Sequence, residues 1–293
     1  MDRYRPHERL VAPAQPTAAP GWLVAGVGLI LLVFMVLNLI YLWVLQALPD
    51  WPMLRHELSD GTTPRALWLI LLGFLPLLAA LALVLRVLHR RPLFGLLGPP
   101  GPALRDFWRV TRALALLFVI LALLPYPDAL APQQRISLGD WAGLIPLSLA
   151  LILLQVATEE LLFRGYLQSQ LAARFRTPVI WMLVPALLFG LLHFDPATYG
   201  SNAVWLAGWA VVFGLAAADL TARSGTLGPA LALHFVNNVS ALMWSSMQGH
   251  WDGLALFALP FGPGNTAMLA GLLPVEGLML LCGWLTARIA LRR

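Results

Sequence analysis

Three short groups of polar residues interrupt apolar stretches in the second half of this 293-residue chain. They are Glu159-Glu160-Leu-Leu-Phe-Arg164, Phe189-Gly-Leu-Leu-His193 and His234-Phe-Val-Asn-Asn238. A carboxylate beside an imidazole can hold a water molecule and take its proton as the water attacks a carbonyl carbon. An imidazole N–H and a carboxamide N–H one helical turn apart can donate to the oxyanion that develops. The residue types therefore predict hydrolysis, with Glu159 as the base and with His234 and Asn238 as the donors.

The same residues also fit a second kind of hydrolytic site. Two histidines and one carboxylate, here Glu159, His193 and His234, could bind Zn²⁺ or another divalent ion that lowers the pKa of a bound water. The spacing alone leaves both mechanisms open. The chain has no His-Glu-x-x-His, Gly-x-Ser-x-Gly, Walker-type or Gly-x-Gly-x-x-Gly motif that would point to other chemistry.

The two adjacent carboxylates are expected to have different roles. Glu160 and Arg164 are four residues apart and share one face of a helix, so we expect an ion pair that orients the site. Glu159 points about 100° away from Glu160 and is left to face the reaction. Phe189 lies one turn before His193, and we expect its packing to set the rotamer of that histidine.

The composition places these groups in a membrane. Hydrophobic residues make up 59% of the chain and charged residues 11%, which is typical of membrane proteins. Eight apolar runs approach the length of a membrane-spanning helix. They are Trp22–Leu48, Ala66–Leu88, Phe107–Pro125, Trp141–Arg174, Pro178–Phe194, Ala203–Asp219, Leu227–Met247 and Ala267–Ala287. We therefore expect an all-α, polytopic integral membrane bundle of about eight transmembrane helices.

The basic residues indicate an orientation. All 19 are Arg, and they lie in clusters between the apolar runs, so no nucleic-acid-binding surface is expected. With the N-terminus in the cytoplasm, only Arg55, Arg65 and Arg135 fall outside, as the positive-inside rule expects. Both termini are then cytoplasmic. Residues 1–21 include a Pro/Ala-rich stretch with nothing to bury, and they are expected to form a flexible cytoplasmic tail.

The three polar groups are expected to lie at one depth in the membrane. Glu159 lies 15 residues before the end of one apolar run at Arg174, and His193 lies 15 residues after the start of the next at Pro178. Each is then about 22 Å from the turn between the two runs, at a rise of 1.5 Å per residue. His234 lies 11 residues after the arginine that follows the preceding run, which is about 16 Å by the same rise. All three can meet near the middle of the membrane.

The ordered set Glu-Glu-x-x-x-Arg, Phe-x-x-x-His and His-x-x-x-Asn resembles the CPBP (CAAX-type) intramembrane protease family, which includes CAAX prenyl endopeptidases and bacterial immunity-type (Abi) relatives. The segments Glu159–Gly165 and Arg223–Asn238 carry the closest likeness. The resemblance implies a protease core at residues 141–247. Residues 22–140 then contribute transmembrane helices without a recognised motif, and residues 248–293 an external loop and a last helix with a basic cytoplasmic end.

The resemblance implies an intramembrane endopeptidase of the bacterial inner membrane. Glu159 and His193 would hold the attacking water, and His234 and Asn238 would form the oxyanion site. The substrate would be a membrane protein or a lipid-associated peptide in the bilayer. A metal-free glutamate mechanism is the better physical match to one free Glu, two separated His and an Asn, so no cofactor is expected, with Zn²⁺ as the alternative.

Two other functions stay open. The chain could be a non-catalytic membrane partner or immunity-type protein that keeps the polar layer for helix packing. It could also be a proton-coupled carrier that uses Glu159, His193 and His234 as a relay. Glu276, in the last apolar run, is isolated from the three groups, and we expect it to lie outside the site as a supporting or protonated structural acid.

Overall fold

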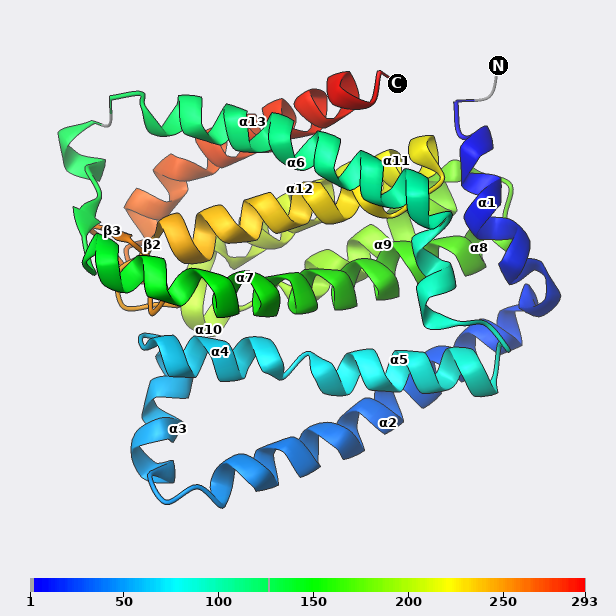
Figure 1. Cartoon of the computed structure of the whole chain (residues 1–293), viewed down its shortest axis with the longest axis horizontal. Coiled ribbons are helices and arrows are strands. Elements are labelled where there is room, and N and C mark those ends of the chain that lie inside the picture. The colour runs from blue at the N-terminus through cyan, green and yellow to red at the C-terminus, as the bar shows by residue number, and fades with distance from the viewer. Residues whose placement is uncertain (1–2, 126, 293) are drawn as a thin grey trace.

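The structure is a computed structural model that describes residues 3–125 and 127–292. The long helices lie side by side in one bundle (Figure 1). They are α2 (Pro20–Gln46), α4 (Pro64–Leu72), α5 (Leu75–Val87), α6 (Pro100–Ala122), α7 (Leu138–Glu160), α9 (Pro178–Leu192), α11 (Ala203–Ser224), α12 (Gly228–Val239) and α13 (Thr266–Leu291). Each of the eight expected apolar runs is helical over most of its length.

Two of these helices continue through a π-helical turn. α7 passes through η5 (Leu161–Leu167) into α8 (Gln168–Arg174), and α12 passes into η7 (Ser240–Trp244). Short elements connect the rest of the chain. They are η1 (Arg5–His7), α1 (Glu8–Val11), η2 (Ala12–Thr17), α3 (Trp51–Asp60), η3 (Leu93–Leu97), η4 (Asp128–Leu130), α10 (Pro196–Tyr199) and η6 (Gly200–Asn202).

Within residues 3–125 and 127–292, five helical stretches are long and apolar enough to cross a membrane, so the chain is a polytopic helical membrane protein. They are Pro20–Gln46, Pro64–Val87, Leu138–Arg174, Pro196–Ser224 and Thr266–Leu291. The other three apolar runs are too short or too polar to meet the same criteria. α9 has 15 residues, α12 has 12, and the first half of α6 carries several charged side chains. The number of eight crossings stays a prediction.

A small three-stranded sheet lies at one end of the bundle. β1 (Gln133–Gln134) pairs antiparallel with β3 (Phe257–Leu259), which pairs in parallel with β2 (Ser245–Met247). A salt bridge of 3.2 Å joins Arg135 to Asp252 here. Both chain termini lie at the opposite end (Figure 1). This arrangement agrees with the grouping of the arginines, although the side that faces the cytoplasm stays a prediction.

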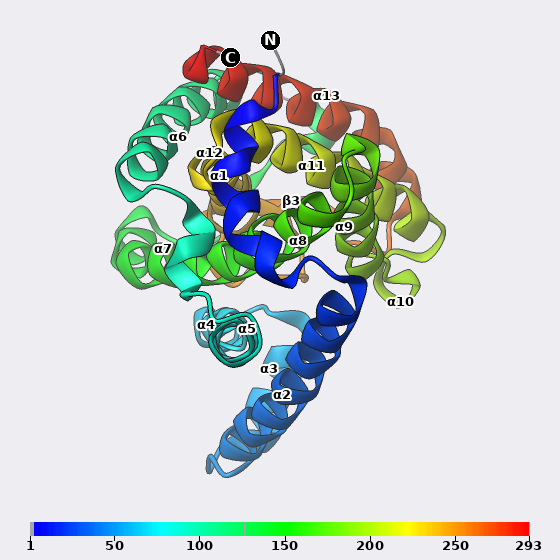
Figure 2. The same ribbon diagram turned by 90° about the vertical axis from the view of Figure 1, so that its right-hand side faces the viewer.

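The N-terminal segment corrects one expectation. Residues 5–17 form η1, α1 and η2, which lie across the end of the bundle (Figure 2). Within the Pro/Ala-rich stretch Val11–Pro20, Val11 and Ala14 are buried, so the prediction that this stretch has nothing to bury was wrong. Leu10, just before it, is also buried. Gly225 ends α11 with a φ of +69°, and a Cβ there would overlap the carbonyl oxygen of Pro6. Residues 1, 2 and 293, at the ends of the predicted tail and of the basic end, lie outside the described residues.

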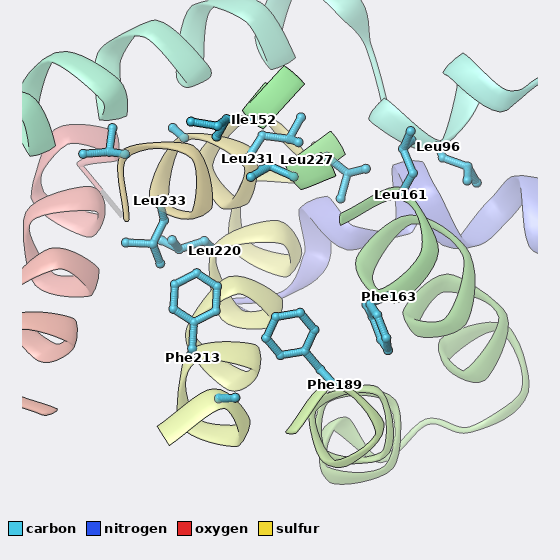
Figure 3. Packing of buried hydrophobic residues seen from close by; sticks show 14 of the residues in the cluster. Leu96, Ile152, Leu161, Phe163, Phe189, Phe213, Leu220, Leu227, Leu231 and Leu233 are labelled. Atoms are coloured by element: carbon cyan, nitrogen blue, oxygen red, sulfur yellow. The ribbon is translucent and has the colours of Figure 1, made fainter. Parts of the chain in front are cut away.

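The core next to the polar groups is aromatic. Phe163 of η5, Phe189 of α9 and Phe213 of α11 pack together among buried leucines (Figure 3). The ring centroids of Phe163 and Phe189 are 5.2 Å apart, and those of Phe189 and Phe213 are 6.1 Å apart. Gly190 allows the backbones of α9 and α11 to approach closely, because a Cβ there would lie 2.7 Å from the carbonyl oxygen of Ala207 in α11.

Candidate active site

The two adjacent glutamates end α7, and the π-helix η5 follows them directly. π-helical turns are rare and occur often at functional sites. Glu160 Oε1 accepts a hydrogen bond from Nη1 of Arg164 over 2.8 Å, and both side chains are buried. The ion pair predicted from their spacing is therefore present. If one partner of such a buried pair is removed, the other charge is left unpaired in the interior, which lowers the stability of the protein.

His234 contacts both glutamates. Its Nδ1 lies 2.8 Å from Oε1 of Glu160, and its Nε2 lies 3.5 Å from Oε2 of Glu159. An ionised carboxylate only accepts hydrogen bonds, so Nδ1 of His234 carries a hydrogen and donates it to Glu160. Glu159 Oε2 is buried and makes no hydrogen bond within the described residues.

His193 lies just past the C-terminal end of α9. Its Nδ1 donates to the backbone oxygen of Phe189 over 2.8 Å, which leaves Nε2 with a free lone pair in the neutral ring. The ring of Phe189 contacts that of His193, at a centroid distance of 4.5 Å, and that of His234, at 5.9 Å. Among the residues that the structure describes, no hydrogen bond or ion pair joins His193 to Glu159.

Phe189 is the common neighbour of the three polar groups. The guanidinium carbon of Arg164 lies 4.7 Å from the centroid of its ring, within the range of a cation–π contact. Phe213 adds a second ring, 5.0 Å from that of His234. The three groups therefore meet in one layer of the bundle, as the depth calculation predicted.

Asn238 contacts a residue that the sequence reasoning missed. Its Nδ2 donates to Oε1 of Gln155 over 2.8 Å, and its Oδ1 accepts from Nδ2 of Asn237 over 3.3 Å. One N–H of the carboxamide is left for another acceptor. Gln155 lies four residues before Glu159 and is buried on the same face of α7. This spacing, in an otherwise apolar run, was the signal that could have identified it.

The described side chains were compared with the donor set of a metal site. The part of the chain that the structure describes has no group of three or more His, Cys, Asp or Glu side chains arranged to hold an ion. His234 directs Nδ1 to Glu160, and the three donors of the alternative metal site, Glu159, His193 and His234, do not form such a group. Among the described residues, the carboxylate of Glu159 has no hydrogen-bond partner and lies beside the imidazole of His234.

Part of the chain is similar in sequence to known proteins. Residues 141–240 match the family described as type II CAAX prenyl endopeptidase, Rce1-like. The uncharacterized protein YyaK of Bacillus subtilis (strain 168) is 29% identical over 119 residues, which is 41% of this chain and 40% of that protein. The match thus spans well under two thirds of that curated relative. No solved structure matches the chain.

The matched region contains Glu159, Glu160, Arg164, His193 and His234, and ends just after Asn238. It coincides with the helices that meet around Phe189, and the helices outside it surround this core. Residues 141–240 of this multi-pass membrane protein thus form a domain of the Rce1-like, CAAX-type (CPBP) protease family.

Proposed function

We propose that the chain is an intramembrane endopeptidase that hydrolyses a peptide bond with a water activated by Glu159. The observation that carries the proposal is the unequal state of the adjacent glutamates. Glu160 accepts hydrogen bonds from Arg164 and from His234 through Oε1, although its Oε2 is buried without a partner. Glu159 accepts no hydrogen bond from a described residue, and its buried Oε2 lies beside Nε2 of His234. Glu159 is therefore the carboxylate that is free to accept a proton.

The proposed reaction has two steps. A water held by Glu159 and by Nε2 of His193 attacks the carbonyl carbon, and Glu159 takes one proton from it. The C–O bond forms and the carbonyl oxygen becomes an oxyanion, which accepts hydrogen bonds from Nε2–H of His234 and from the remaining N–H of Asn238. The C–N bond then breaks as Glu159 passes its proton to the leaving nitrogen, and a carboxylic acid and an amine are released.

This assignment gives His234 a hydrogen on both ring nitrogens. Its charge, with that of Arg164, then balances the charges of Glu159 and Glu160 in a layer where a net charge is costly. Glu160 supports this state because it accepts from Nδ1 of the imidazole. Gln155 has the matching role for Asn238, whose amide it holds in one orientation.

We further propose that the chain crosses the bacterial inner membrane about eight times with both termini in the cytoplasm, and that its substrate is a membrane protein or a lipid-associated peptide. Single-cysteine labelling in intact cells tests the orientation. Arg90 and Gln248 are exposed at opposite ends of the bundle. An impermeant maleimide should label Gln248→Cys and spare Arg90→Cys, and the reverse pattern would contradict the proposal.

The substrate can be sought directly. New peptide ends among membrane proteins should be compared between cells that make the wild-type chain and cells that make the Glu159→Gln variant at the same level. The proposal predicts ends that appear only with the wild-type chain. An identical set of ends, together with full rescue of a deletion phenotype by Glu159→Gln, would favour the non-catalytic partner role.

A further inference from the structure

A small cavity lined by polar and apolar side chains lies behind the aromatic wall of the candidate site, between α6, α11, α12, η7, β2 and α13. Its volume is about 130 Å³, and since one water needs roughly 10–15 Å³ of such space, it can hold a whole side-chain end group. Trp209 and Phe213 form one wall, with ring centroids 5.5 Å apart. The polar groups that line it are Asn237, Ser240, Ser245 and Glu276.

The cavity is one side chain away from the proposed oxyanion donors. Phe213 lines the cavity and also contacts the ring of His234, at a centroid distance of 5.0 Å. Asn237 lines the cavity and donates to Oδ1 of Asn238 over 3.3 Å. Phe213 and Asn237 alone therefore separate this cavity from a peptide whose scissile carbonyl lies at His234 and Asn238.

Two polar groups in the cavity have no partner. Ser245 Oγ is buried and makes no hydrogen bond within the described residues. The carboxylate of Glu276 makes no hydrogen bond or ion pair there either, although its backbone oxygen accepts from Nε1 of Trp209 over 3.2 Å. Glu276 lies in α13, one of the stretches apolar enough to cross a membrane. Its side chain is exposed on the surface of the bundle. A carboxylate within a membrane span needs a cation or a donor beside it, and the described residues provide none.

We propose that this cavity is a subsite for a basic side chain, Lys or Arg, of the peptide substrate. Glu276 binds the ammonium or guanidinium group, Ser245 accepts one of its N–H hydrogens, and the faces of Trp209 and Phe213 attract its charge. An apolar side chain would leave Glu276 and Ser245 unpaired, which is the basis of strong discrimination by polar pockets. The inference rests on the proposed function, since it takes the substrate to be a peptide.

Binding to an inactive chain tests the subsite apart from catalysis. The probes are fluorescent, N-lauroylated Ala/Leu peptide amides in which one Arg is moved through five successive positions, each paired with a peptide that has the neutral isostere citrulline in its place. Dissociation constants are measured for full-length Glu159→Gln protein in phosphatidylcholine nanodiscs. At one position the Arg peptide should bind at least about tenfold more tightly than its citrulline partner.

Three further variants, made in the same Glu159→Gln background, test whether Glu276 causes the preference for Arg. Glu276→Gln should abolish it and Glu276→Asp should keep most of it, while Asp140→Asn, at the exposed start of α7, should leave it unchanged. Equal binding of each Arg and citrulline pair, no binding of any peptide, or a preference that survives Glu276→Gln would overturn the subsite. A preference that disappears when the nanodiscs contain phosphatidylethanolamine would also overturn it, because the cavity would then take a lipid amine.

Cleavage by the chain with Glu159 intact separates this inference from the proposed function. Cleavage without any Arg preference would contradict the subsite and support the protease. Selective binding of Arg peptides without cleavage of any of them would support the subsite and contradict the protease. The isosteric Glu276→Gln also distinguishes a protonated structural acid, since such an acid would lose nothing on this change.

Discussion

The Nδ1 atom of His234 lies 2.8 Å from Oε1 of Glu160, the same oxygen that accepts from Arg164. Glu160 therefore fixes two positively charged or hydrogen-donating groups at once and is itself fully buried. This relationship divides the adjacent glutamates into one that organises the site and one that is free to take a proton. The predictions below separate these roles.

Breaking the buried ion pair should lower stability. Glu160→Gln leaves the Arg164 guanidinium unpaired, and Arg164→Ala leaves the Glu160 carboxylate unpaired, so each should cost about 3–5 kcal/mol. Unfolding of purified protein in mixed detergent micelles measures the loss. Arg112→Ala is the control, because Arg112 is exposed and should change stability by about 0.5 kcal/mol or less. A Glu160→Gln protein of wild-type stability without activity would indicate that Glu160 is the base.

Removing the acceptor that orients Asn238 should reduce turnover. Asn238→Ala removes an oxyanion donor and should cost about 10²–10³ in kcat with little change in KM. Gln155→Met keeps the volume but loses the 2.8 Å hydrogen bond, and we expect a smaller loss. The kcat of the double variant should equal that of Asn238→Ala alone, because the two residues act through one contact. Additive losses would show that Gln155 acts elsewhere, and Gln134→Met, on an exposed strand, serves as the control.

The docked N-terminal segment should loosen in acid. Burial lowers the pKa of His7 to about 4, below the usual value of about 6.5 in an unfolded chain. Between these values the unfolded segment binds more protons, so its docking weakens as pH falls from about 6.5 to 4 and is unaffected above that window. Wild-type protein should lose on the order of 1–2 kcal/mol more stability than His7→Phe between pH 7 and pH 5.

The control for this pH dependence is His56→Gln, since His56 is exposed in α3. It should follow the wild-type profile. Limited proteolysis of residues 5–17 at the two pH values provides a local measurement. If His7→Phe and the wild-type chain lose the same stability, His7 does not report on the docking of this segment.

Activity should not depend on a bound metal, because the site does not gather three donors around one point. A strong chelator should leave the cleavage rate of purified protein unchanged, and metal analysis of the active protein should give far less than one ion per chain. His193→Ala and His234→Ala should both lose activity without any change in metal content. One ion per chain, whose removal reversibly abolishes activity, would require a metal mechanism instead.

The sequence was sufficient for the features that depend on local spacing. Glu160 and Arg164 pair because i and i+4 residues share a helix face, and the apolar runs became helices because nothing else satisfies their backbone. That the three polar groups lie close together followed from counting residues along the helices. The same counting placed His234 near Glu159.

Contacts between distant segments could not be read in this way. The hydrogen bond between Asn238 and Gln155, and that between His234 and Glu160, depend on the rotation of α12 against α7, which no local pattern fixes. The burial of Leu10 was missed because residues 5–17 lack a helical repeat of apolar residues and are buried by docking on other helices. The π-helix η5 likewise has no recognisable signal in the sequence.

The most direct measurement concerns Glu159 itself. Purified wild-type, Glu159→Gln and Glu160→Gln proteins are reconstituted in liposomes with a substrate identified from cells, and single-turnover cleavage is followed alongside unfolding stability. We expect Glu159→Gln to bind substrate and remain as stable as the wild-type chain while its cleavage rate falls to background, and Glu160→Gln to lose stability. Cleavage by Glu159→Gln at close to the wild-type rate would contradict the assignment of Glu159 as the base.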